Sequence, residues 1–536
     1  MALQFLFEAA PWLQGADKTT LSAATVGVVL VPVVLALLYL HKSKSNEQGT
    51  RKIHKLPGTL PILGNTVVFF RNISRRHEWF TSLVNHYKGE PFTIKWFGNP
   101  PRVLLSTVEA YEEVLKTKFD NFPKGPKQIE ILRDVLGEGI FASDNGKWAH
   151  QRKTAVNLFT ARALRETMAE TMRKYTHVLL DIFDRTSEND TTLDLVKILS
   201  RFTIEAFAEI GFGIEMNCLD AKEEHPLQSA FDRAQRLSAL RYQRPPAFWK
   251  LQRLLGVGAE KQLKEDVKVI DEAVFDIISK ALANRHTRKT SETPNLVSIF
   301  LDRADNAQDE ERNIDPVFLR DMVVNFMFAG RDTTAQAMSW FFVSLSTRPD
   351  VGEKIRKEIS AVIPELATGK IKVPTMEQVQ QLTFLDAAIK ESLRLYPAVP
   401  AIPKFIEKDT LLSDGTFLRR GSVAVLPTYA FARAKHVWGE DAADYKPERW
   451  IDETTGKVRN ESSFKFASFN AGPRICLGMN LAMLEMKIVL ASLLSRYQID
   501  LVPGQTITYD NALTLAIKGE MNVSVKKLHR PLVGDK

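Results

Sequence analysis

The chain contains only two cysteines, Cys218 and Cys476, among its 536 residues. Two thiols are too few for a disulfide-rich scaffold and for a zinc site with four cysteine ligands. No G-x-G-x-x-G sequence is present, so the usual dinucleotide-binding turn is missing. No stripe of Lys and Arg interleaved with aromatic residues occurs either, although the net charge is +8. This composition argues against nucleic acid as a partner and suits an anionic membrane surface or an acidic protein.

Linkers between domains are also missing. After residue 65 there is no Gly/Ser-rich or Pro-rich stretch and no internal repeat. Apolar residues make up 44% of the chain, which is enough for a large core. We therefore expect residues 66–536 to form one large domain, although the length alone would suggest several.

A long run without charge is present near the N-terminus. Residues 21–40, LSAATVGVVLVPVVLALLYL, carry no charged side chain and have the length that crosses a bilayer as a helix. The basic stretch after this run outweighs the single Lys18 before it, so we expect residues 1–20 in the lumen and the rest in the cytosol. Residues 41–65 then form a basic flank and a proline-rich hinge, because LPGTLPILGN cannot continue a helix. The alternative is a buried core helix over 21–40.

Hydrophobic patterns predict a mostly α fold with a minor β portion. Short β-branched runs predict strands near residues 91–106, helical patterns dominate to about residue 395, and extended segments return near 414–427. The clearest helix begins with Asp315 at the N-cap and Pro316 in the first turn. This helix is apolar nearly all round except at AGRDTT (329–334). A polar cluster inside a buried helix costs stability unless its groups are satisfied or used.

The loop FNAGPRICLG, residues 469–478, holds Cys476 near Arg474 and between two glycines. Gly472 and Gly478 predict a rigid turn with backbone N–H groups directed at the sulfur, and the helix that follows adds its positive end. Such surroundings favour the thiolate, which is the metal-ligating form. A buried structural thiol is the alternative, but it does not account for the glycines and the arginine. A lone thiolate suits an axial ligand of haem iron.

The spacing Phe-x-x-Gly-x-Arg-x-Cys-x-Gly resembles the haem-binding loop of the cytochrome P-450 monooxygenases. Further motifs of that superfamily follow in the expected order over residues 56–530: WAHQR (148–152), AGRDTT, ESLR (391–394) and PERW (447–450). The resemblance implies the cytochrome P-450 fold and the insertion of one oxygen atom from O₂ into a lipophilic substrate. It also implies haem b, held without covalent attachment because no C-x-x-C-H motif occurs.

The resemblance assigns roles to residues around the haem. Trp148 and Arg152, one helical turn apart, would contact a haem propionate, since the planar fork of arginine fits a carboxylate. Lys404 stands where many members of the superfamily carry Arg or His, so its role as a propionate partner is open. The implied iron ligand is Cys476, and the implied haem-contacting residues are Trp148, Arg152, Lys404, Phe469, Gly472, Arg474 and Gly478.

Two further groups follow from the same resemblance. Asp332 and Thr333 would relay protons to bound O₂, while Ala329 and Gly330 leave space beside the helix. The Thr333 hydroxyl can also bond to the carbonyl of Ala329, four residues back. The expected structural ion network consists of Glu391, Arg394 and Arg449, in which the first two share a helix face.

Several stretches resemble the plant and fungal branch that hydroxylates fatty acids at or near the ω end, among them AGRDTTAQAMSWFF and FARAKHVWGEDAADYKPERW. An apolar lining suits an alkyl chain, and an arginine from RLSALRYQR (236–244) is a candidate to hold the carboxylate. Sterols, alkanes and xenobiotics are the alternative substrates. The expected lining residues are Ile140, Phe141, Phe326, Ala329, Ala401 and Ile402.

Electrons must come from another protein, because the chain has no dinucleotide-binding pattern of its own. The expected partner is an NADPH-cytochrome P-450 reductase, and the expected location is the endoplasmic reticulum membrane, where the chain works as a monomer with its catalytic domain in the cytosol. Two other functions remain: a reductase-independent haem-thiolate isomerase or dehydratase, and a haem sensor. The Asp332–Thr333 pair argues against both.

Overall fold

The computed structural model describes residues 49–285, 295–305 and 315–528. The predicted lumenal segment 1–20, the predicted anchor 21–40 and residues 41–48 of the basic flank lie outside these ranges. Within the described ranges no helix is both long enough and apolar enough to cross a bilayer.

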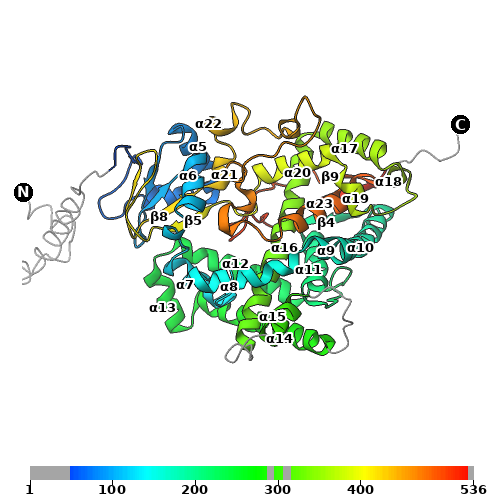
Figure 1. Cartoon of the computed structure of the whole chain (residues 1–536), viewed down its shortest axis with the longest axis horizontal. Helices are drawn as coiled ribbons and strands as arrows, with labels where there is room; N and C mark the ends of the chain where they lie inside the picture. Colours follow the sequence, from blue (N-terminus) through cyan, green and yellow to red (C-terminus); the bar gives the residue numbers. More distant parts are fainter. Residues whose placement is uncertain (1–48, 286–294, 306–314, 529–536) are drawn as a thin grey trace, which may run out of the picture.

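The fold is mostly α with a smaller β portion, as the sequence predicts. The largest sheet, which contains β5 (Ile402–Phe405) and β8 (Val423–Leu426), lies at one side of the molecule, while β4 (Thr192–Asp194) and β9 (Tyr497–Leu501) lie among the helices at the other side (Figure 1). The helices are α4 (Thr66–Arg71), α5 (Arg76–His86), α6 (Val108–Glu112), α7 (Pro126–Leu136), α8 (Asn145–Ala155), α9 (Ala161–Ala163), α10 (Ala169–Glu188), α11 (Leu195–Phe212), α12 (Pro226–Gln243), α13 (Pro246–Leu255), α14 (Gly258–Arg285), α15 (Leu296–Asp305), α16 (Pro316–Thr347), α17 (Pro349–Val362), α18 (Pro364–Thr368), α19 (Met376–Gln380), α20 (Thr383–Leu395), α21 (Thr428–Phe431), α22 (Lys435–Trp438) and α23 (Met479–Leu494).

Three sheets accompany these helices. The largest has the strand order β1-β2-β3-β8-β5, in which β1 with β2 and β3 with β8 are parallel pairs. A second has the order β4-β10-β9, and β6 pairs with β7. The strands are β1 (His54–Lys55), β2 (Phe92–Ile94), β3 (Arg102–Leu104), β4 (Thr192–Asp194), β5 (Ile402–Phe405), β6 (Thr410–Leu411), β7 (Phe417–Leu418), β8 (Val423–Leu426), β9 (Tyr497–Leu501) and β10 (Asn522–Lys527).

Helix α16 runs through the middle of the molecule and begins as its sequence predicts (Figure 1). The Asp315 side chain accepts a hydrogen bond from the backbone N–H of Val317, and Pro316 occupies the first turn, where no N–H is needed. The helix packs along α11 and belongs to the largest apolar cluster of the protein. Its polar stretch 329–334 is therefore held deep inside the fold.

Part of the predicted hinge is folded into the domain. His54 and Lys55 pair with Phe92 and Thr93 in the large sheet. Gly64, at φ +58°, lies against the backbone of Lys95, where a Cβ would come within 2.3 Å of the Lys95 carbonyl oxygen. The prolines of 56–65 do prevent a helix, but the turn they form packs on the sheet. Residues 54–64 of the predicted hinge therefore belong to the folded domain.

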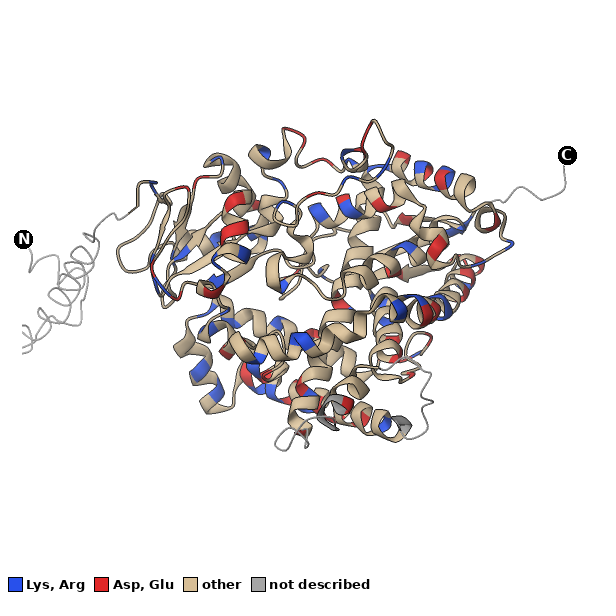
Figure 2. Cartoon of the chain, viewed as in Figure 1, with Lys and Arg blue, Asp and Glu red and all other residues tan. Residues whose placement is uncertain are grey.

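The net positive charge is spread over the surface. Basic and acidic positions alternate along outer helices such as α10 and α17 (Figure 2). Many of them form exposed pairs, for example Arg173 with Glu170 and Lys354 with Asp350. Partly exposed pairs of this kind contribute little to stability.

Candidate functional site

One large cavity, of about 480 Å³, lies between the largest sheet, α16 and the loop that carries Cys476. Its wall is mainly apolar and aromatic, with contributions from Phe141, Phe159, Phe326 and Phe328. All six predicted lining residues contribute to this wall, namely Ile140, Phe141, Phe326, Ala329, Ala401 and Ile402. These six residues come from three separate regions of the chain, 140–141, 326–329 and 401–402.

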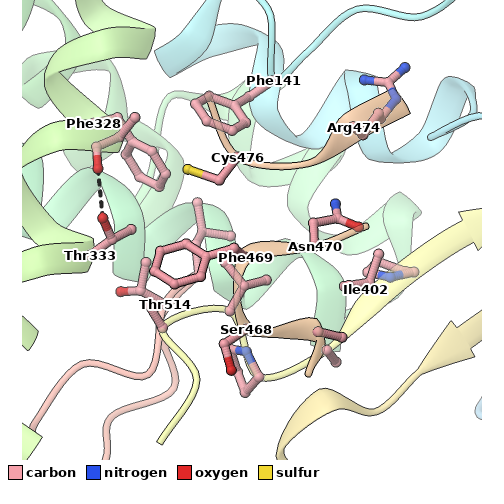
Figure 3. A pocket seen from close by; sticks show the side chains of 18 of the residues that line it. Phe141, Phe328, Thr333, Ile402, Ser468, Phe469, Asn470, Arg474, Cys476 and Thr514 are labelled. Atoms are coloured by element: carbon pink, nitrogen blue, oxygen red, sulfur yellow. Dashed lines mark hydrogen bonds between the residues drawn. The ribbon is translucent and has the colours of Figure 1, made fainter. Parts of the chain in front are cut away.

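The cysteine loop forms the floor of this cavity. The backbone N–H of Cys476 donates to the Phe469 carbonyl at 2.9 Å, which closes the loop on itself. Gly472 does not line the cavity but makes the loop possible, because it has φ +62° and its Cβ would lie 2.1 Å from the Leu115 carbonyl oxygen. The Ser468 hydroxyl donates to the Leu393 carbonyl at 2.8 Å and ties the loop to α20. The Cys476 sulfur points into the cavity (Figure 3).

Arg152 is the cation whose charge acts on the Cys476 thiol. The Cys476 side chain is accessible from the cavity. Its partial removal from water still raises the pKa of the thiol, while the backbone N–H of Gly478 and the charge of Arg152 act in the opposite direction. The Arg152 guanidinium is fixed by a 2.7 Å hydrogen bond to the Ile475 carbonyl. Arg474, in contrast, is directed away from the sulfur (Figure 3) and pairs with Asp144 at 2.5 Å. The expectation that Arg474 favours the thiolate is therefore wrong, and Arg152 takes that role.

A cationic wall adjoins the loop. Lys124, Lys404 and Arg474 line the cavity together, and Asp144 is the one carboxylate whose charge acts on all three. Burial, reinforced by the neighbouring cations, lowers the pKa of Lys404 to about 7 and holds that of Lys124 well below its usual range. Among the described residues neither ammonium has a hydrogen-bond acceptor, and the Nε of Arg474 is buried without one. The three cations therefore share one carboxylate, and the wall carries an excess of positive charge.

The excess of cations fits the two carboxylates of a haem. An unsatisfied buried guanidinium nitrogen and two lysines without acceptors are what a group with propionates would satisfy. The described residues contain no cluster of three or more His, Cys, Asp or Glu side chains that would bind a metal ion directly. A single thiol at the floor and cations at the wall therefore match an iron that is already bound in a porphyrin when it enters the site.

The two residues of α16 that were predicted to relay protons, Asp332 and Thr333, have different partners. The Thr333 hydroxyl donates to the Ala329 carbonyl at 2.7 Å, as the sequence predicts (Figure 3). Asp332 does not line the cavity. It accepts a hydrogen bond from the Thr514 hydroxyl, and Thr514 does line the cavity. Burial raises the pKa of Asp332, although the adjacent Arg331 opposes this shift. Sequence reasoning missed Thr514, since nothing in its local sequence marks it.

Gly330 has a packing role. A Cβ at this position would lie 2.3 Å from the Phe207 ring of α11. The close approach of α16 and α11 therefore requires glycine here. Gly330 and Ala329 also line the cavity, so the structure leaves open space beside the helix at these two positions.

The predicted ion network is present behind the loop. Glu391 is fully buried and accepts hydrogen bonds from Arg394 at 2.7 and 2.8 Å and from Arg449 at 2.8 Å. The indole N–H of Trp450 donates to the same carboxylate at 2.8 Å. Burial raises the pKa of Glu391, but the two guanidiniums outweigh it and leave that pKa below its usual value. The network joins α20 to the segment 447–450 beneath the cysteine loop.

Two cavity-lining arginines were not predicted from the sequence. Arg76 begins α5 and Arg102 begins β3. The arginines of 236–244, which the sequence suggested for a carboxylate, lie outside the cavity lining, and Arg241 instead pairs with Glu260 at 2.6 Å.

Comparison with known proteins agrees with this geometry. Cytochrome P450 86B1 of Arabidopsis thaliana is 32% identical over 507 residues, which cover 92% of this chain and 89% of that protein. Cytochrome P450 94B1 of the same plant is 33% identical, with 93% and 97% covered. Cytochrome P450 CYP94D108 of Paris polyphylla is 35% identical, with 78% and 82% covered. Residues 55–522, which include the whole cavity wall and the cysteine loop, match the family Cytochrome P450, and the chain therefore belongs to this family of haem-dependent monooxygenases.

Proposed function

We propose that this protein hydroxylates medium- or long-chain fatty acids at or near the ω carbon, with electrons from an NADPH-dependent reductase. The observation that carries the proposal is the joint presence of a cysteine thiol at the floor of the cavity and a mainly aromatic and aliphatic wall above it. Such a wall suits an alkyl chain and offers few groups that would orient a polar substrate. The resemblance of several stretches to the plant and fungal fatty-acid branch points the same way.

The residues that would hold the haem follow from the site. Cys476 is the proposed iron ligand, and Lys124, Lys404 and Arg474 are the proposed partners of the propionates. Trp148 contributes its ring to the same wall and lies under the Arg474 guanidinium at 4.3 Å. Bound haem supplies the activation of O₂ and the transfer of one oxygen atom to a C–H bond.

The polar groups of α16 would handle protons at the cavity wall. Because burial raises the pKa of Asp332, its carboxyl retains a proton more readily than an exposed aspartate. The Thr514 hydroxyl bonds to that carboxyl and faces the cavity, so it can pass a proton from Asp332 inward. Thr333 has its hydroxyl on the same wall and can exchange the Ala329 carbonyl for a cavity partner.

The proposed setting is the endoplasmic reticulum membrane, with residues 21–40 as a single anchor and the catalytic domain in the cytosol. The uncharged length of that stretch and the basic residues after it support this orientation. A monomer in contact with lipid and with a reductase is sufficient for the reaction. Exposed apolar side chains on α4 and α13, including Phe70 and Leu254, fit a surface that touches the membrane.

The test is turnover by the full-length haem protein with reductase, NADPH and a series of saturated fatty acids. We expect ω or subterminal hydroxy acids, and we expect Cys476→Ser to abolish both the product and the red-shifted Soret band of the reduced carbon monoxide complex. Turnover and a haem spin shift with sterols, alkanes or xenobiotics but with no fatty acid would reject the substrate class. Product formation from a peroxide without a reductase would favour an isomerase or dehydratase instead.

A further inference from the structure

Arg76 and Arg102 line the cavity without an ion-pair partner among the described residues. The Arg102 guanidinium lies over the Trp96 ring at 4.2 Å, and its Nε is buried with no hydrogen-bond acceptor. The Nε of Arg76 donates to the Nε2 of His77 at 3.2 Å. A buried guanidinium normally has a carboxylate or several carbonyl acceptors, because its transfer from water is costly.

The groups around these two arginines add positive charge and do not supply the missing anion. Burial, with a smaller contribution from the nearby Arg76 and against the opposing effect of Tyr242, lowers the pKa of Arg102 to about 10. Lys127 adds a third cation, since the charge of Arg102 lowers the pKa of that lysine. The acidic groups that act on Arg76 are Tyr509 and Asp510. The Tyr509 hydroxyl donates to Glu78, and the Asp510 carboxylate is engaged by Arg236 at 2.8 Å.

This cationic cluster is separate from the proposed propionate wall. The charged or titratable groups that act on Arg102 are Tyr242 and Arg76. Those that act on Lys404 are Arg474 and Asp144. The two clusters therefore share no electrostatic partner, and we expect propionates bound at the wall that contains Lys404 to leave Arg102 and Arg76 without an anion.

Neutral hydrogen-bond donors accompany the arginines. Tyr242 and Gln243, at the end of α12, both line the cavity, and the Nε2 of Gln243 is buried without an acceptor. The stretch 236–244 thus contributes a phenol and an amide to the cavity, while its own arginines are engaged elsewhere. Arg244, for example, contacts Gln252 at 3.4 Å and stacks on Phe248.

We propose that Arg102, together with Arg76, binds the carboxylate of the substrate and so orients it with its alkyl end toward Cys476. The inference rests on the proposed fatty-acid substrate. The planar fork of a guanidinium matches the two oxygens of a carboxylate. Because this end of the substrate is fixed, the carbon that reaches the haem is set by chain length, which accounts for attack at or near the ω carbon.

The test is the haem spin shift of the full-length holoprotein during titration with dodecanoate and with 1-dodecanol, which has the same chain and no charge. Arg102→Met should weaken dodecanoate binding roughly 10- to 100-fold, the range for a hydrogen bond to a charged group. Its affinity for 1-dodecanol should stay close to that of the wild type. Arg244→Met is the matched control, since that arginine belongs to the same region but lies outside the cavity lining, and it should change neither titration.

Two further variants keep the test decisive if Arg102→Met fails to fold. Arg102→Lys retains the charge without the fork and should give an intermediate affinity, and Arg76→Met should weaken dodecanoate selectively. An equal loss for dodecanoate and 1-dodecanol, or no loss for either, overturns the inference while the fatty-acid function stands. If the wild type itself neither binds nor oxidises any fatty acid, the proposed function fails first and the inference fails with it.

Discussion

Replacement of Glu391 by Gln would test the buried ion network most directly. The Glu391 carboxylate accepts side-chain hydrogen bonds from Arg394, Arg449 and Trp450 and one from the backbone N–H of Lys446 at 3.0 Å. A glutamine has one acceptor oxygen, and its amide group would face donors. Arg394 has only 1% of its side chain exposed, so its charge would remain buried without a counter-ion.

The expected loss in the free energy of unfolding is about 3–5 kcal/mol, the usual cost of removing one partner from a buried pair. The whole free energy of unfolding of a typical domain is about 5–15 kcal/mol. Because the expected loss is a large part of this, the variant should retain haem poorly. Denaturant unfolding, monitored through the Soret band, measures this loss. A refolding experiment shows whether the unfolding is reversible.

The matched control is Glu440→Gln. Glu440 pairs with Lys435 at 2.7 Å, but its side chain is 87% exposed. We therefore expect this variant to lose less than about 0.5 kcal/mol of the free energy of unfolding. If Glu391→Gln and Glu440→Gln are equally stable, the network does not support the haem loop in the way the geometry indicates.

Three other predictions address the loop, the proton path and the response to acid. Gly472→Ala should destabilise the protein by more than Gly504→Ala, because both positions have positive φ but only the first has a carbonyl oxygen within contact range of a Cβ. Thermal loss of the Soret band compares the two variants, and equal losses would show that φ alone matters. Thr514→Val should reduce the share of NADPH recovered as hydroxylated product about tenfold or more, whereas Thr514→Ser should keep coupling close to wild type; unchanged coupling in the valine variant would reject the path through this hydroxyl. Since the pKa of Glu391 is lower in the folded state, its stabilising contribution is complete above about pH 5 and is lost as the pH falls through the pKa of the folded state. The free energy of unfolding, measured from pH 6 to 3, should therefore fall more steeply for the wild type than for Glu391→Gln.

Local signals in the sequence predicted the elements that depend on local chemistry. Asp315 and Pro316 define the start of α16 because capping involves residues only a few positions apart. Glu391 and Arg394 pair because their spacing places them on one helix face. The Thr333 hydroxyl finds the carbonyl of Ala329 for the same reason.

Contacts between distant segments were beyond such reasoning. Arg102 enters the cavity from a strand and Arg76 from a helix, and the lack of an anion near them appears only in three dimensions. Arg474 is near Cys476 in sequence, yet its partner is Asp144, which lies 330 positions away. Asp332 looked like a cavity residue because Thr333 is one, but adjacent helical positions differ in direction by about 100°, and its carboxyl meets Thr514 instead.

The sheet β4-β10-β9 makes the order of synthesis important for this chain. Leu193 pairs with Val523, and the loop that carries Thr514 is suspended between β9 and β10. At about 5–20 residues per second, roughly 20–60 s separate the synthesis of these two paired residues. During that interval helices α10 and α11 carry an unpaired strand edge between them, and such edges invite association with other chains. A nascent chain with a complete Cys476 loop therefore still lacks the cavity wall that carries Thr514, and that wall is complete only after β10 has been synthesised.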